Sequence, residues 1–153
     1  MTKIITTLVF FIATFLTVNA QQYEQGMGKA LGLWKEGKST EAVALLERIA
    51  LAEKDNWLPN YYIALISTTE AFNPANKDKI NALLSKSDEV LALELEKNPN
   101  NAELLVVQAM SKTALLASDP MTYGMTLSPK IAEIYTRASI IAPENPRVVF
   151  CKA

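Results

Sequence analysis

The segment Lys97-Asn98-Pro99-Asn100-Asn101-Ala102-Glu103 decides how this chain folds, because it ends one helix and starts the next. Proline cannot continue a helix, and an Asn side chain accepts hydrogen bonds from the free N–H groups that begin another. Two similar segments occur elsewhere, Lys54–Pro59 (KDNWLP) and Ala142–Arg147 (APENPR). The three junctions are 45 and 44 residues apart, and this regular spacing predicts a repeated helical unit.

Between the junctions, apolar residues recur at helical spacing, and no segment alternates as a β-strand does. The clearest unit has one apolar stripe before Gly37 and another after it, with Ser39 or Thr40 as the predicted cap of the second helix. The short connection between the two helices predicts an antiparallel hairpin. Composition predicts loops at Asn73–Asp78 and Ser118–Pro129. The predicted fold class is all-α.

The first twenty residues have the three-part pattern of a secretory signal peptide. Lys3 supplies a positive start, Ile4–Val18 is apolar, and small residues precede Gln21. These 15 apolar residues are fewer than the roughly 20 that a membrane-spanning helix needs. Cleavage is therefore favoured over the alternative of an uncleaved membrane anchor. We expect a mature domain of residues 21–153 that is exported by a bacterium to the periplasm or the medium, without membrane insertion after cleavage.

Composition narrows the possible functions. The chain has 15 basic and 16 acidic residues and no basic cluster, so nothing predicts binding to nucleic acid. It has no His, which removes the commonest general base and a common zinc ligand. The single cysteine, Cys151, cannot form an internal disulfide and has no activating neighbour in sequence except Lys152. We expect no catalysis, no cofactor and no metal site.

The segment Lys35–Ile49 resembles the middle of a tetratricopeptide repeat. In that family a Gly ends the first helix, a small Ala begins a close helix contact, and a large apolar residue follows. Gly37, Ala42 and Leu46 stand at these places, and Asn98–Ala102 resembles the joint between two repeats. The period here is about ten residues longer than the family's 34, through insertions within the second and third units. Most of the consensus residues of the first helix are missing.

The resemblance implies a right-handed stack of antiparallel helical hairpins, an α-solenoid with about three hairpins and a truncated seventh helix. The units would cover about residues 23–56, 57–101 and 102–145, with a fourth starting at 146. Such stacks bind a protein or peptide in a concave groove lined by the first helix of each hairpin. The implied groove residues are Glu24, Met27, Lys35, Tyr61, Thr68, Glu103, Met110 and Thr113. For three further residues of the same stripes, filling the core is the preferred interpretation: Leu31, Leu65 and Val106.

Some members of the family hold a peptide carboxylate with a Lys and an Asn, but Met27 and Leu31 stand at those places here. The resemblance therefore implies binding through apolar and aromatic contacts. The predicted loop Ser118–Pro129 is a second candidate surface, because it carries three side chains suited to an adaptable interface: Met121, Tyr123 and Met125. The alternative is that these side chains only seal the end of the third hairpin.

Two functional hypotheses follow. The first is a non-catalytic scaffold of the bacterial cell envelope that binds a protein or peptide partner. The alternative is a structural, self-associating module, either a homo-oligomer through the C-terminal face or part of a longer repeat array. It is favoured by the helix predicted after Asn145, which is too short to be stable alone and is expected to leave Val148, Val149 and Phe150 partly open.

Overall fold

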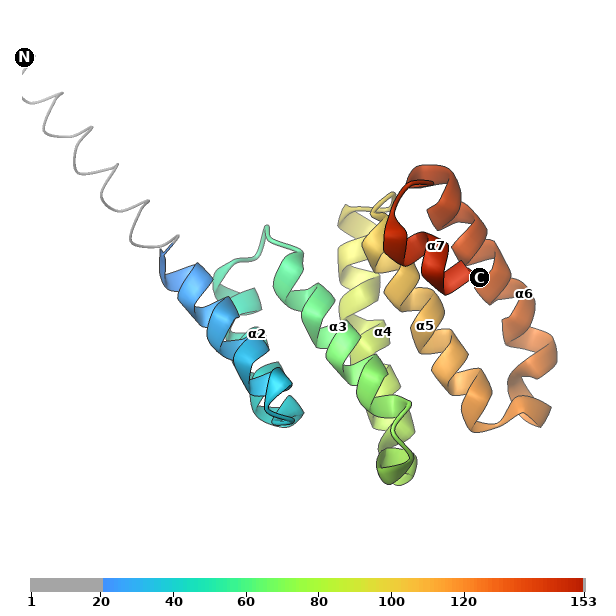
Figure 1. The fold of residues 1–153 in the computed structure, drawn as a ribbon, viewed down its shortest axis with the longest axis horizontal. Coiled ribbons are helices and arrows are strands. Elements are labelled where there is room, and N and C mark those ends of the chain that lie inside the picture. Colours follow the sequence, from blue (N-terminus) through green and yellow to red (C-terminus); the bar gives the residue numbers. More distant parts are fainter. Residues whose placement is uncertain (1–20, 153) are drawn as a thin grey trace, which may run out of the picture.

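The computed structural model describes residues 21–152, and every regular element in this range is a helix. The order is a first helix over residues 21–35, then α2 Ser39–Ala52, α3 Leu58–Ala71, the 3-10 helix η1 Pro74–Lys79, α4 Ile80–Lys97, α5 Ala102–Ser118, α6 Pro120–Ile141 and α7 Pro146–Lys152 (Figure 1). The predicted all-α class is confirmed for these residues. The predicted signal peptide lies outside them. None of the helices described here is long and apolar enough to cross a membrane.

The three predicted junctions share one backbone geometry. At each, the helix ends on a residue whose N–H donates to the carbonyl four positions back: Glu53, Asn98 and Ala142. Three positions later, an Asn N–H donates to the carbonyl of that end residue: Asn56, Asn101 and Asn145. The side chain of each Asn then accepts from the N–H two residues further on: Leu58, Glu103 and Arg147. Asn101 and Asn145 stand directly before α5 and α7 and cap them, as predicted, whereas Asn56 stands two residues before α3, and Trp57 occupies the cap position of that helix.

Gly37 ends the first helix, as predicted. Its φ of +79° lies in the left-handed region, which glycine adopts without the steric cost of a Cβ. The N–H of Gly37 donates to the Trp34 carbonyl and that of Lys38 to the Leu33 carbonyl, which is the Schellman pattern of a helix end. The chain therefore reverses after residue 37 without leaving the last carbonyls of the helix unpaired.

The predicted cap at Ser39 or Thr40 is wrong. Helix α2 begins at Ser39, and no side chain caps it. The Ser39 hydroxyl donates instead to the Glu70 carboxylate of α3. Local sequence rules expect the Ser39 hydroxyl to cap α2, but it bonds Glu70 on another helix instead. Such a tertiary contact is not contained in the local sequence.

Both predicted loops are helical. Asn73–Asp78 forms most of η1, and the Asn73 side chain accepts a hydrogen bond from the Ala75 N–H. In Ser118–Pro129, the helix α6 begins at Pro120, because the Asp119 side chain caps it by accepting the N–H of Thr122. Asn73 and Asp119, which the composition places in loops, therefore cap the starts of helices.

Pro129 lies inside α6, where its ring removes one backbone hydrogen bond and normally costs about 3 kcal/mol. Pro129 itself is exposed. The neighbouring hydroxyl groups of Thr126 and Ser128 donate to the carbonyls of Tyr123 and Gly124 on the preceding turn. The helix continues because its other residues still pack on α5, a tertiary contribution that the sequence pattern does not display.

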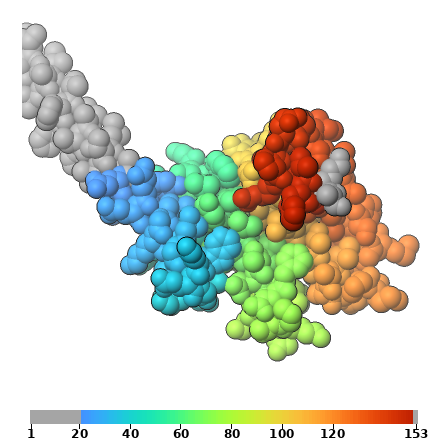
Figure 2. All heavy atoms as spheres, viewed as in Figure 1, coloured from blue at the N-terminus to red at the C-terminus, as the bar shows by residue number. Residues whose placement is uncertain are grey.

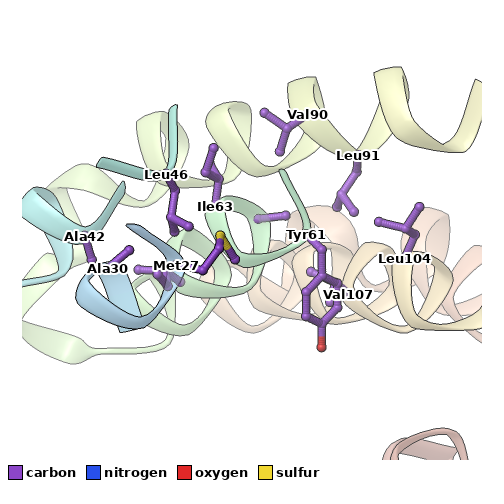
Figure 3. Close-up of a cluster of buried hydrophobic side chains, with 12 residues drawn as sticks. Met27, Ala30, Ala42, Leu46, Tyr61, Ile63, Val90, Leu91, Leu104 and Val107 are labelled. Carbon is purple, nitrogen blue, oxygen red and sulfur yellow. The ribbon is translucent and has the colours of Figure 1, made fainter. Parts of the chain in front are cut away.

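The main core joins the first described helix, α2, α3, α4 and α5. Figure 3 shows its labelled side chains: Met27, Ala30, Ala42, Leu46, Tyr61, Ile63, Val90, Leu91, Leu104 and Val107. A second cluster lies between α5, α6 and α7 and contains Leu105, Val106, Ala138 and Val148. The prediction that Val148 lies partly open is wrong, because α7 buries this side chain in the cluster and leaves it only 1% exposed. A third joins α3, α4 and α5 through Ala71, Leu84 and Ala114.

From α2 onward each α-helix packs on the next, and α5 also packs on both α3 and α7. Figure 1 shows α3 and α5 side by side, with α7 across the upper end of α5. Two long basic side chains reach back to an earlier junction. Lys97 at the end of α4 donates to the Lys54 carbonyl, and Arg137 of α6 donates to the Pro99 carbonyl.

Candidate functional site

Two predicted groove residues of α3 belong to the core, which corrects their assignment to an open groove. Tyr61 is only 4% exposed, and Thr68 is fully buried with its hydroxyl 2.9 Å from that of Ser87 on α4. The residues that follow each of them are more open: Tyr62 is half-buried and Thr69 is exposed. Successive residues of a helix differ by about 100° in direction, so the predicted surface was placed one position too early.

Glu103 is the centre of a polar cluster drawn from α3, α5 and the start of α7. Its carboxylate accepts hydrogen bonds from the Tyr61 hydroxyl at 3.3 Å and from the Asn145 side-chain amide at 2.7 Å. The Arg147 Nε lies 3.3 Å from the same carboxylate, and its guanidinium lies 5.6 Å from the centre of the Tyr61 ring. Glu103, predicted as a groove residue, therefore holds three helices together with its side chain partly open to solvent.

The other predicted groove residues are dispersed. Met27 is buried in the main core, whereas Glu24 and Lys35 are exposed on the first helix. Met110 and Thr113 of α5 are half-buried; Met110 packs against the second core cluster. Val106 is buried as predicted, while Leu31 and Leu65 are only half-buried.

The three residues of the second candidate surface lie on α6 rather than on a loop. Met121 and Met125 are 95% and 94% exposed, and Tyr123 is half-buried. Met121 and Met125 are one turn apart, so their side chains lie on one side of α6. Helix α6 is the second helix of its predicted hairpin, and this surface is therefore separate from the groove residues of the first helices.

Five side chains of α3 and α5 that are partly or fully open to solvent are together called the inner face: Tyr62, Leu65, Thr69, Glu103 and Met110. The three α3 residues recur at i, i+3 and i+7, and the two α5 residues are seven apart, so each set lies along one stripe of its helix. The Tyr61 and Tyr62 rings pack edge to face with centroids 5.1 Å apart. Tyr62 and Thr69 are not among the groove residues predicted from the sequence, although their helical spacing marks a second stripe beside the buried one.

The inner face ends at a small cavity of about 300 Å³, where the C-terminal ends of α3 and α5 meet η1. Phe72, Ala114 and Ala117 are among its lining residues, and Phe72 is one of the exposed large apolar side chains of the protein. An apolar side chain of a bound segment would fit a hollow of this size and lining.

A larger cavity, of about 390 Å³, lies on a different side between α2 and α4. Its lining includes apolar residues and polar ones: Val43, Ile66, Leu83, Ser39, Glu70 and Lys86. The Lys86 ammonium lies 2.6 Å from the Glu47 carboxylate, and Glu70 accepts hydrogen bonds from Ser39 and Asn76. Three separate helices and η1 form this cavity, so no local sequence pattern predicts it. Lys86 and Glu47 pair with each other, and Glu70 is occupied by two neutral donors, so these groups do not define the chemistry of a ligand.

The electrostatics around α7 do not activate a nucleophile. Burial raises the pKa of the Cys151 thiol; the positive charge of Arg147 lowers it and the negative charge of Glu103 raises it. Burial also raises the pKa of the neighbouring Tyr135 phenol. Both groups therefore stay protonated at neutral pH. In residues 21–152, no group of three or more His, Cys, Asp or Glu side chains is arranged to hold a metal ion.

Comparisons of the chain with protein-family models, with curated proteins and with solved structures find no match.

Proposed function

We propose that this chain is a non-catalytic scaffold that binds a protein or peptide partner on its inner face. In this proposal the helices form a right-handed, tetratricopeptide-like stack of three hairpins, and α7 is the first helix of a fourth. The observation that carries it is the repetition of one hydrogen-bonded turn at Asn56, Asn101 and Asn145. These turns, together with the packing of α5 on α3 and α7, are consistent with a row of first helices.

The chemistry of the inner face favours a partner with apolar side chains. Tyr62 and Leu65 offer aromatic and aliphatic area, and aromatic residues dominate the energetics of many protein interfaces. Charge is confined to the end of the face near Glu103, where Arg147 is already engaged by this carboxylate. We therefore expect binding that depends little on salt, because screening weakens exposed charge pairs far more than apolar contact.

The test compares two substitutions that introduce the same side chain at exposed hydroxyl residues. Thr69→Arg places a bulky charge on the inner face, and Ser85→Arg places it on the open side of α4. The measurement is a pull-down from the envelope fraction of the native cell at low and high salt, with captured proteins identified by mass spectrometry. We expect wild type and Ser85→Arg to capture the same partner, and Thr69→Arg to lose it with helicity unchanged by circular dichroism. Equal capture by all three proteins would show that the inner face is not the binding site.

The place of action is a separate part of the proposal. The signal-peptide pattern of the first twenty residues supports export, to the periplasm or the medium of a bacterium. Intact mass spectrometry of the processed protein tests it, and the expected N-terminus is Gln21. A species that keeps Met1 to Ala20 in the membrane fraction would move the scaffold to the membrane-anchored class.

A further inference from the structure

The methionine sulfur atoms of residues 21–152 are divided between the core and one surface of α6. Met27 is 7% exposed in the main core, and Met110 is half-buried against the second cluster. Met121 and Met125, by contrast, are 95% and 94% exposed on α6. The end of α5 and the start of α6, in orange, lie at the edge of the molecule in Figure 2. A reagent in solution therefore reaches the thioethers of Met121 and Met125 before those of the other two.

The thioether group sets this pair apart from other exposed apolar residues. Leu51, Leu93 and Ile140 are also more than half exposed, but their side chains are hydrocarbon and offer no lone pair to an oxidant. A methionine sulfur attacks one oxygen of a peroxide, so that an S–O bond forms and the O–O bond breaks. The transferred oxygen gives its proton to the leaving hydroxide, which departs as water. The sulfur loses two electrons, the peroxide gains them, and the product is methionine sulfoxide.

The single thiol is a weaker competitor for such an oxidant. The reactive form of a cysteine is the thiolate, and its fraction falls as the pKa rises above the ambient pH. Cys151 is half-buried, and burial raises the pKa of its thiol, so the group stays protonated at neutral pH. A thioether needs no deprotonation to react. At neutral pH, exposure therefore decides which sulfur atom of the described residues is oxidised.

The first turns of α6 can carry a sulfoxide without loss of the fold. The Asp119 side chain caps this helix by accepting from the Thr122 N–H, and the Tyr123 N–H donates to the Asp119 carbonyl. Neither bond uses a methionine side chain. A sulfoxide at Met121 or Met125 stays in water, so its polarity carries no burial cost. At Met27 the same polar group would lie among apolar core side chains and would be destabilising.

We propose that Met121 and Met125 form an oxidation site, at which peroxides convert the two exposed thioethers to sulfoxides while the fold persists. The two residues are one turn apart, so both reactions change the same side of α6 from apolar to polar. The site lies on a different helix from the inner face, and the proposal does not depend on the function assigned to that face.

Hydrogen peroxide at neutral pH is the probe that tests this site. The purified protein is treated with it for increasing times, and peptide mass spectrometry measures the oxygen gained at each methionine. We expect Met121 and Met125 to be oxidised at least tenfold faster than Met27, with helicity unchanged by circular dichroism. In concentrated urea, where unfolding opens every side chain, we expect the rates to become similar.

The matched control is the double variant Met121→Leu/Met125→Leu, which keeps apolar side chains of similar volume and helix propensity. We expect it to stay folded and largely unmodified over the interval in which the wild type gains two oxygen atoms. Oxidation of Met27 as fast as Met121 in the folded protein would overturn the proposal. So would a loss of helicity in the oxidised wild type that the treated double variant does not show. A rate difference that persists in urea would also overturn it, because exposure would then not select the site.

Discussion

Glu103 makes more side-chain hydrogen bonds and ion pairs than any other groove residue predicted from the sequence. Its two carboxylate oxygens accept from Tyr61 and Asn145, and Arg147 pairs with it from α7. A partly buried carboxylate with several donors fixes its neighbours, because removing it leaves those donors without an acceptor. The same side chain borders the inner face, so its first role is to set the position of α7 beside α3 and α5.

Tyr61 and Tyr62 give a sharp prediction at the residue scale. Tyr61→Ala should reduce the free energy of unfolding by about 3 kcal/mol or more, because it empties a core position. Tyr62→Ala should cost only about 1 kcal/mol, because that ring is half-buried. Urea unfolding followed by circular dichroism measures both. Equal losses for the two variants would mean that the rings do not differ in burial as described.

The sequence does not distinguish these two residues. Both are tyrosines at the start of α3, and an apolar stripe can be drawn through either one. The direction of each side chain depends on the phase of α3 against α4 and α5, and Ser87 and Glu103 on those helices set this phase through their hydrogen bonds with Thr68 and Tyr61. For this reason the sequence predicted the helix and its neighbourhood but not which side chains face solvent.

At the scale of elements, the sequence predicted where helices end and restart better than it predicted loops. Gly37 and the junction Asn residues satisfy backbone groups within their own segment, so their roles follow from local chemistry. The segments Asn73–Asp78 and Ser118–Pro129 became helical because Asn73 and Asp119 cap helices there. The presence of Pro129 inside α6 depends on tertiary packing, and no local pattern contains that information.

The same substitution at two glycines should have opposite effects on stability. Gly37→Ala should destabilise the protein by about 1–2 kcal/mol, because a Cβ is strained in the left-handed region. Gly28→Ala should stabilise it by about 0.5–1 kcal/mol, because residue 28 is helical and a Cβ there meets nothing within 4 Å. Thermal and urea unfolding of the two variants measure the signs. A stabilised Gly37→Ala variant would contradict the helix end described here.

At the scale of the whole molecule, the chain is held by contacts between successive helices and by small polar clusters across the junctions. The all-helical class was predictable, because apolar spacing and turn chemistry agreed along residues 21–152. The way α7 lies on α5 and α6 was not predictable, because it depends on contacts with Glu103, 42 positions before Asn145, and with Tyr135 on the preceding helix. The cavity between α2 and α4 was missed for the same reason.

Alkaline pH should weaken the packing of α7 on α6 and so lower the stability of the fold. Burial raises the pKa of Tyr135 and Cys151 above the ordinary values of 10.0 and 9.0, so the folded protein holds these protons more tightly than the unfolded chain. Their contribution is fully present below pH 9 and is lost as the pH rises through the raised values. We expect the free energy of unfolding to fall above pH 9, and to fall less steeply in Tyr135→Phe. Urea unfolding between pH 7 and about 11 measures this; identical pH slopes for the two proteins would contradict it.

The contact of Arg147 with Tyr61 also has a kinetic consequence. The two residues are 147 − 61 = 86 positions apart, and α5 lies between their helices in the chain. Most other helix contacts join neighbours, whose short loops close at little entropic cost. We therefore expect the Arg147 contact to form after the folding transition state, when α4, α5 and α6 are already in place. Interactions that form so late slow unfolding without speeding folding, so we expect α7 to govern how long the protein stays folded rather than how quickly it folds.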